Sequence, residues 1–101
     1  MRYKKNIQAV NARITGAVQK HINNMLRRLE RYVPEINWVD MYFRKEGKQP
    51  TANRTLRVRL GIPGTDVFAS ESGTRWRTIL RQVEEKLERQ LKRRKRTHAA
   101  F

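Results

Sequence analysis

The residues with the clearest chemistry in this sequence are lysines and arginines that recur at helical spacing on two segments. They are Lys20, Arg27, Arg28 and Arg31 on the first segment, and Lys86, Arg89, Lys92, Arg93 and Lys95 on the second. Guanidinium and ammonium groups in such rows can hold the phosphates of a nucleic acid. We predict that these residues bind RNA. For the first row taken by itself, solubility is the simpler interpretation.

A second set of residues could bind RNA by a different chemistry. Trp38, Tyr42 and Phe68 are expected on one face of a sheet, with Arg57 and Arg59 among them. Aromatic rings interleaved with arginines can stack on unpaired bases. Ordinary cross-strand packing explains the same pattern, and we prefer that interpretation. The aromatic set remains an alternative RNA-binding site.

Catalytic and metal-binding patterns are missing from the sequence. The two histidines, His21 and His98, are far apart, and there is no cysteine. No glycine-rich phosphate loop, nucleophile motif or metal-ligand spacing occurs. We therefore predict no catalytic residue, no metal site and no cofactor, and we expect that the protein is not an enzyme.

The composition favours a nucleic acid as the partner. The chain has 101 residues, which is the size of one small domain, and we treat 1–101 as a single unit. Its 24 basic residues against 9 acidic ones give a formal net charge of +15, which is typical of nucleic-acid binding. No segment is apolar enough to span a membrane, and no secretory signal is visible. We expect a cytoplasmic protein that binds RNA, with no membrane and no DNA involved.

Two long helices are predicted from apolar residues at three- and four-residue spacing. The first is expected to run from a cap at Thr15 to Val33, where Pro34 stops it. The second is expected from Thr74 to Thr97, with Thr74 as a plausible N-cap.

The second helix changes character near its end. After Leu91 the next core position is Arg94, inside the basic run 92–96. Self-repulsion disfavours so dense a cluster unless a partner neutralises it, although many charge runs are simply solvated surface. We expect a basic helical tail, about residues 92–101, that leaves the domain and meets something acidic and extended.

The strands and the helices together predict the fold. Strands are expected at Lys5 to Val10, Ile36 to Arg44, Arg54 to Leu60 and Asp66 to Glu71. Between the last two, Pro63-Gly64 suits a type II turn. A right-handed crossover should make the first two strands parallel, and the others should form an antiparallel meander. The prediction is an α+β fold of order β-α-β-β-β-α, a four-stranded mixed sheet with both helices on one face. If the helices lie side by side, their basic rows could merge into one strip.

These segments resemble the hibernation-promoting factor family, which includes ribosome-associated inhibitor A. The resemblance runs from about Ile7 to Thr97 and is most specific in KLERQLKRRK, residues 86–95. The matching residues there are Lys86, Arg89, Gln90, Lys92 and Lys95. The segments NARIT, LERYVPEIN and ASESG add support. The sequence departs from the family at Arg75-Trp76-Arg77, where the family's last helix begins with acidic and aromatic residues, so different contacts are expected there.

The resemblance implies the same fold and a definite function. It implies binding to the small ribosomal subunit and its rRNA, in the channel between head and body, in competition with tRNA and mRNA. Such binding silences idle ribosomes. Long members of the family carry a further domain through which ribosomes dimerise, and we expect that domain to be absent because this chain ends at Phe101.

Other classes of function remain open at this point. The main alternative is a general RNA-binding module or RNA chaperone that uses the open sheet face. A double-stranded-RNA domain also contains a helix, three strands and a helix, but it concentrates basic residues at the start of its last helix. A membrane-surface or acidic-protein adaptor is the third possibility.

Overall fold

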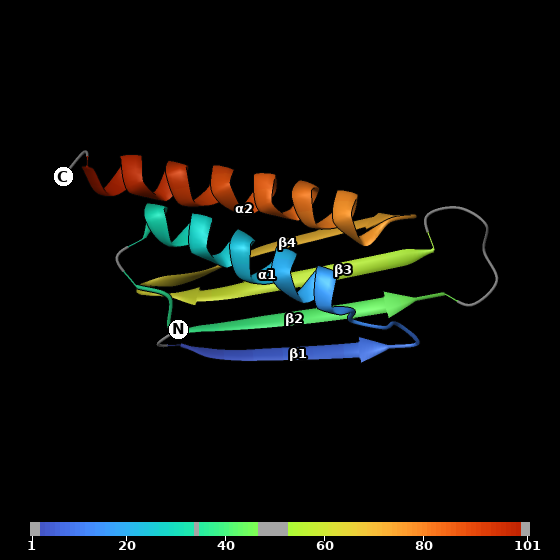
Figure 1. Ribbon diagram of the computed structural model, residues 1–101. Coiled ribbons are helices and arrows are strands. Elements are labelled where there is room, and N and C mark those ends of the chain that lie inside the picture. Colours follow the sequence, from blue (N-terminus) through green and yellow to red (C-terminus); the bar gives the residue numbers. More distant parts are fainter. Residues whose placement is uncertain (1–2, 34, 47–52, 100–101) are drawn as a thin grey trace.

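The computed structural model describes residues 3–33, 35–46 and 53–99, with side chains described up to position 93. Its elements follow the predicted order (Figure 1). They are β1 (Lys4–Val10), α1 (Gly16–Leu29), the 3-10 turn η1 (Glu30–Tyr32), β2 (Trp38–Lys45), β3 (Arg54–Ile62), β4 (Thr65–Gly73) and α2 (Trp76–Ala99).

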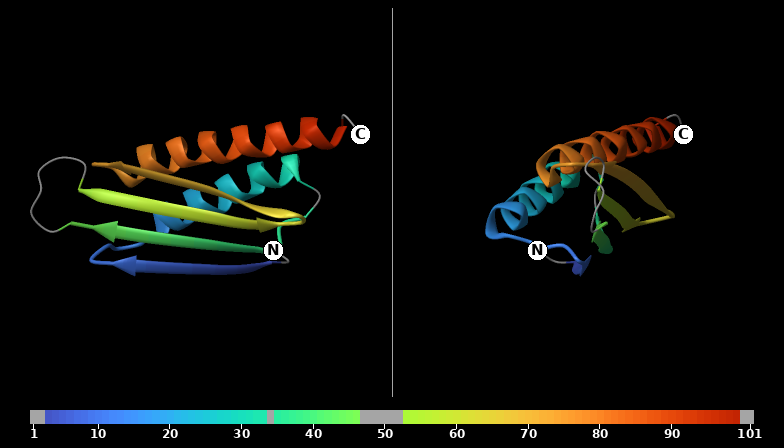
Figure 2. Two further views of the ribbon diagram at one scale, coloured as in Figure 1. Left: turned by 180° about the vertical axis from the view of Figure 1, so that it is seen from behind. Right: turned by 90° about the vertical axis from the view of Figure 1, so that its right-hand side faces the viewer.

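The four strands form one mixed sheet with the spatial order β1-β2-β3-β4. β1 and β2 are parallel, with Ile7 opposite Met41, and β2, β3 and β4 form an antiparallel meander. Both helices cover the same face of this sheet, α1 on the side of β1 and β2 and α2 along β4, and the other face is open (Figures 1 and 2). The predicted fold class is confirmed.

The core lies between the helices and the sheet, and the apolar stripes predicted from the sequence supply it. From α1 and α2 the buried residues are Ile22, Met25, Leu26, Leu29, Ile79, Leu80, Val83, Leu87 and Leu91. From the strands they include Val39, Met41, Phe43, Leu56, Val58, Leu60, Val67 and Ala69. No charged or polar residue of the described part is buried. Consequently, every described cation is at least partly available to solvent.

The first helix begins as predicted but ends earlier. Thr15 caps it, because its Oγ1 accepts a hydrogen bond of 3.2 Å from the backbone N–H of Val18. The regular helix ends at Leu29, and the tighter turn η1 replaces the predicted continuation to Val33. This turn presents Tyr32 to α2, where its hydroxyl donates a hydrogen bond of 2.7 Å to Glu88.

The start of the second helix differs from the prediction. Its first residue is Trp76, and the first backbone bond across its start runs from Ile79 N–H to the carbonyl of Arg75. Thr74 is therefore not the cap. Its carbonyl instead accepts a hydrogen bond of 2.7 Å from the Arg54 guanidinium, so Thr74 is tied to β3 in the bend between β4 and α2.

The hairpin between β3 and β4 is tighter than predicted. Ile62 pairs with Thr65, so only Pro63 and Gly64 remain in the turn. Gly64 has φ of 96°, the positive value that the third position of a type II turn requires. The Pro-Gly turn is thus in the predicted place, and each flanking strand reaches closer to it than expected.

The last turns of α2 extend past the ends of the strands (Figure 1). Leu91 is its last buried residue among the side chains described, and the helix continues to Ala99. This agrees with the predicted departure of the helix from its domain. Within the described ranges, no helix combines the length and apolar character needed to cross a membrane.

Candidate RNA-binding surface

The two helices lie side by side and run in the same direction (Figure 1). Two contacts define this arrangement: Arg28 with Glu84, and Tyr32 with Glu88. Each contact joins residues 56 positions apart. The step of four residues from Arg28 to Tyr32 therefore corresponds to the step of four residues from Glu84 to Glu88 along α2. The flank of α2 that faces α1 is therefore the flank that carries these two glutamates.

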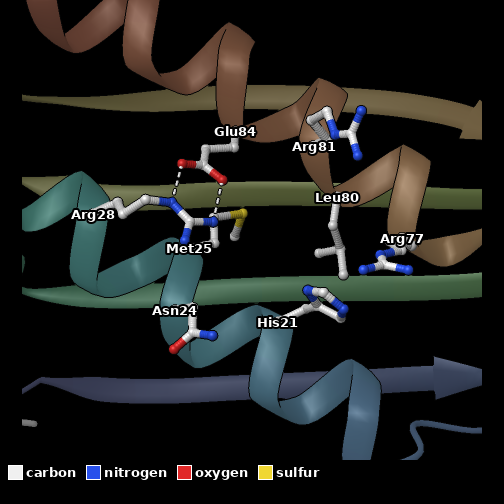
Figure 3. A pocket seen from close by; sticks show the side chains of 8 residues that line it. All are labelled: His21, Asn24, Met25, Arg28, Arg77, Leu80, Arg81 and Glu84. Atoms are coloured by element: carbon white, nitrogen blue, oxygen red, sulfur yellow. Dashed lines mark hydrogen bonds and ion pairs between the residues drawn. The ribbon is translucent and has the colours of Figure 1, made fainter.

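The pair Arg28–Glu84 bridges the helices with the geometry of two parallel hydrogen bonds (Figure 3). Nε and Nη2 of the guanidinium donate to the two carboxylate oxygens, each at 2.7 Å. These hydrogen bonds raise the pKa of Arg28. Such forked pairs are the strongest of the common ion pairs. Arg28, a predicted phosphate ligand, is thus already bonded to a carboxylate.

A second cluster joins the helices one turn further on. Glu88 accepts the hydrogen bond from the Tyr32 hydroxyl and lies 3.0 Å from Nζ of Lys92. The Lys92 ammonium also lies 5.5 Å from the centre of the Tyr32 ring. The hydrogen bond from Tyr32, followed by that from Lys92, lowers the pKa of Glu88. Lys92, like Arg28, therefore has an acidic partner within the protein.

These two clusters determine whether the basic rows of α1 and α2 can form one continuous strip. A continuous strip between the helices would require the basic flank of α2 to face α1. Instead Glu84 and Glu88 occupy that position and neutralise Arg28 and Lys92. The two rows are therefore separated by paired acidic residues, and Lys20, Arg27, Arg31 and Arg89 lie further out on each helix.

The opposite flank of α2 lies along the edge of the sheet. Gln90 makes two hydrogen bonds with the backbone of Phe68 in β4: its amide donates to the carbonyl at 2.6 Å and its oxygen accepts from the N–H at 3.2 Å. Lys86 donates to the carbonyl of Ser70 at 3.1 Å and lies 3.1 Å from Glu71. β4 is an edge strand, and unpaired backbone groups on such strands invite pairing with other chains. Lys86 and Gln90 cover this part of the edge.

Replacing Gln90 by alanine should lower the stability of the fold and expose this edge. Loss of two hydrogen bonds should reduce the free energy of unfolding by about 1–2 kcal/mol, which corresponds to a decrease in Tm of roughly 5–10 °C for a domain of this size. Arg89→Ala is the matched control, because Arg89 is exposed and makes no hydrogen bond among the described residues. Thermal melts and sedimentation velocity at increasing concentration test this. Equal Tm values for the two variants would show that the contact contributes nothing.

Several predicted RNA ligands are exposed and make no ion pair within the described part of the chain. We call them the outer cations: Lys20, Arg27, Arg31 and Arg89. Arg28, Lys86 and Lys92 are paired with glutamates, as described above. Arg93 is exposed and has a contact of its own. The side chain of Lys95 lies outside the described residues, as does that of His98.

Two further cations were not among the predicted ligands. Arg77 and Arg81 are exposed, make no ion pair in the described ranges, and line the groove between the helices (Figure 3). The signal in the sequence is their spacing: Arg77, Arg81, Glu84 and Glu88 follow one another at three or four residues, so all four share one flank. That flank could be assigned to the helix interface only once the packing was known.

The open sheet face carries the aromatic residues where the sequence placed them. The register sets Tyr42 beside Arg57, and it places Arg59 between Asp40 and Phe68. Phe68 is 44% exposed, and the Arg59 guanidinium lies 5.6 Å from the centre of its ring. A hollow of about 210 Å³ lies next to Tyr42, Arg57 and Arg59.

Trp38 behaves differently from the other two aromatic residues. Its ring lies against the backbone of Gly61, so closely that a methyl group at Gly61 would overlap it. This contact favours the packing interpretation for Trp38. Stacking of RNA bases on Tyr42 and Phe68 stays a prediction. Among the described residues, no group of three acidic, histidine or cysteine side chains could hold a metal ion.

The chain also matches a known protein family. Residues 5–99 match the model of the family described as Sigma 54 modulation protein / S30EA ribosomal protein. The chain belongs to this family. The resemblance to hibernation-promoting factors seen in the sequence is thereby confirmed. No curated protein matches the chain in sequence.

Solved structures show the same fold. The crystal structure of the Thermus thermophilus Protein Y N-terminal domain is similar with a TM-score of 0.76 at 24% identity, covering 92% of this chain and 98% of that chain. The structure of a ribosomal subunit interface protein from Coxiella burnetii is similar with a TM-score of 0.75 at 17% identity, covering 91% of this chain and 97% of that chain. At these identities the similarity establishes the fold, and the family match establishes the membership.

Proposed function

We propose that this protein binds the small ribosomal subunit through rRNA phosphates and inhibits translation by occupying the channel that mRNA and tRNA use. The observation that carries the proposal is the set of outer cations, exposed and without ion pairs, on the helical face of a family member with net charge +15. The Coxiella burnetii protein of similar fold is described as a ribosomal subunit interface protein, which supports a ribosomal partner.

The shape of the molecule suits inhibition by occupancy. Its extents are 50 × 25 × 19 Å, and α2 accounts for much of the length. Lysine and arginine contacts to phosphates position a protein on RNA without reading its sequence. A basic domain of this size would fill a cleft lined by rRNA and exclude other ligands from it. In this proposal the protein is not an enzyme, because inhibition requires only binding.

Co-sedimentation with purified ribosomal subunits tests the proposal. Wild-type protein is expected to pellet with small subunits and to remain in the supernatant with large subunits at equal concentration. The large subunit is the appropriate control because it presents rRNA phosphates without this channel. Equal binding to both subunits would contradict the proposed specificity and favour a general RNA-binding protein.

A second candidate function uses the open sheet face to bind single-stranded RNA. The observation that favours it is the exposed Phe68 with Arg59 at its ring, next to the hollow beside Tyr42 and Arg57. Asp40 also lines this hollow and would repel a phosphate. The helical surface is therefore the better candidate, and variants that separate the two surfaces are described in the Discussion.

A further inference from the structure

The groove between α1 and the amino-terminal half of α2 has a composition suited to an anion. It has a volume of about 300 Å³ and is lined by His21, Asn24, Met25, Arg28, Arg77, Leu80, Arg81 and Glu84. Met25 and Leu80 are buried and form its floor. The volume is several times the roughly 30 Å³ that one water molecule occupies in the liquid. A phosphodiester group can therefore enter it.

The charges in this groove do not cancel. Glu84 is its one acidic residue, and both of its carboxylate oxygens accept hydrogen bonds from Arg28 at 2.7 Å. That pair is neutral as a unit. Arg77 and Arg81 then remain as two positive charges without an ion pair in the described part of the chain.

The positions of these two arginines are unfavourable for the isolated protein. They are four residues apart on one helix, where like charges repel each other. No acidic residue is present in the first turn of either helix to offset them. A bound anion would reduce the repulsion between the two arginines. Ligand binding therefore explains their positions better than helix packing does.

The donor set of the groove indicates which anion would bind. Arginine forks match the geometry of phosphate oxygens, and the ring of His21 adds a further hydrogen-bonding group to the groove. Figure 3 shows the His21 ring of α1 near Leu80 and Arg77 of α2, whereas the Asn24 side chain points away from α2. The lining contains no tryptophan, tyrosine or phenylalanine, which stacking on a base would require.

We infer that this groove binds a phosphate group of the RNA backbone, held by Arg77, Arg81 and His21. The inference rests on the proposed function and extends it, because none of these three residues is among the outer cations. Arg77 and Arg89 are twelve residues apart, which is about 18 Å along a helix. The RNA contact would therefore run along about half of α2, from its first turn to Arg89.

The double variant Arg77→Gln, Arg81→Gln tests this inference. It should weaken binding to small subunits by about 10- to 100-fold, the effect of losing two charged phosphate contacts. Lys4→Gln, Arg13→Gln is the matched control, because both residues are exposed, make no ion pair among the described residues and lie outside the groove. The control removes the same charge and should keep nearly all of the affinity. Equal losses in the two variants would overturn the inference.

A variant with the opposite effect separates ligand binding from a structural role. Glu84→Gln removes the one acidic group of the groove and releases Arg28, so it should bind a hexauridylate oligonucleotide several-fold more tightly than the wild type does. A residue that only stabilised the helix packing would give weaker binding when replaced. Unchanged or weaker binding by this variant, with an unchanged melting curve, would count against the groove.

NMR titrations identify the source of the phosphate. Hexauridylate should shift the signals of the Arg77 and Arg81 guanidinium groups and of the His21 ring, whereas inorganic phosphate at the same phosphate concentration should shift them far less. Saturation by inorganic phosphate at that concentration would overturn the assignment to RNA. If the wild type fails to sediment with small subunits, the proposed function is wrong, and the oligonucleotide titration then decides the groove alone. If sedimentation is normal and the arginine variant matches its control, only the groove inference fails.

Discussion

Replacing the outer cations Lys20, Arg27, Arg31 and Arg89 by glutamine is expected to weaken binding to the small subunit by roughly 10²- to 10³-fold, if each contributes about 0.7–1 kcal/mol. The fold should be unaffected, because all four side chains are exposed and make no ion pair in the described part of the chain. Quantitative sedimentation or fluorescence anisotropy measures the loss, and a thermal melt confirms folding.

The matched variant for the other surface is Tyr42→Ser, Phe68→Ser, which removes from the open sheet face the two aromatic rings that could still stack on RNA bases. It should reduce binding to the small subunit much less than the four glutamines do. The opposite ranking, with the sheet variant inactive and the helical variant unchanged, would establish the second candidate function and refute the first.

Salt is expected to abolish the interaction over a narrow range. If six to ten phosphates are contacted, the affinity should fall by roughly 10³- to 10⁵-fold between 50 and 200 mM salt, on the scale known for duplex DNA. The physical cause is the release of counterions from RNA when lysines and arginines replace them. A nearly flat salt response would contradict the electrostatic account, whatever the affinity at low salt.

The four-glutamine variant makes the salt experiment sharper. Each phosphate contact that is lost should reduce the slope of log K against log salt by about one unit. The variant should therefore have a slope lower by about four than the wild type. A variant that binds weakly with the wild-type slope would indicate a folding or packing defect and not the loss of phosphate contacts.

The layered fold was predictable because it depends on periodicity. The apolar residues from Ile79 to Leu91 and those around Ile22 both had to be removed from water. One face of the sheet can cover both helices. Alternation in Leu56, Val58 and Leu60 fixed which side of the sheet was covered. The ends of elements were less predictable: Thr74 has the chemistry of a cap, but its carbonyl is held by Arg54, a contact across the fold.

The arrangement of charges was only partly predictable, because it depends on how α2 is rotated about its own axis. Its sequence shows an acidic flank and a basic flank without indicating which of them faces α1. The acidic flank does, so Arg28 and Lys92 are paired with Glu84 and Glu88.

The role of Lys86 and Gln90 was likewise hidden in the sequence. Both belong to the segment that resembles the family most specifically, and Lys86 was predicted to bind RNA. In the structure both reach the backbone of β4. That contact could not be foreseen without knowing that α2 lies along the edge of the sheet. A motif shared with a family can therefore serve the fold as well as the ligand.

The claim that the protein acts by occupancy also predicts reversibility. Washing inhibited subunits with high salt should remove the protein, leave the rRNA intact and restore full translation activity. Cleaved rRNA, or subunits that remain inactive after the wash, would indicate a chemical reaction and contradict inhibition by binding alone.

The most direct test of the central claim is competition between this protein and the ligands of the channel. Binding of the amino-terminally labelled protein is measured by fluorescence anisotropy on small subunits that are empty or already filled with mRNA and tRNA. Mutually exclusive ligands must weaken each other by the same factor, so the reciprocal experiment with labelled tRNA gives an internal check. The account predicts that filled subunits raise the apparent Kd at least tenfold, a change of about 1.4 kcal/mol. The same Kd on empty and filled subunits would place the binding site outside the channel and contradict the account.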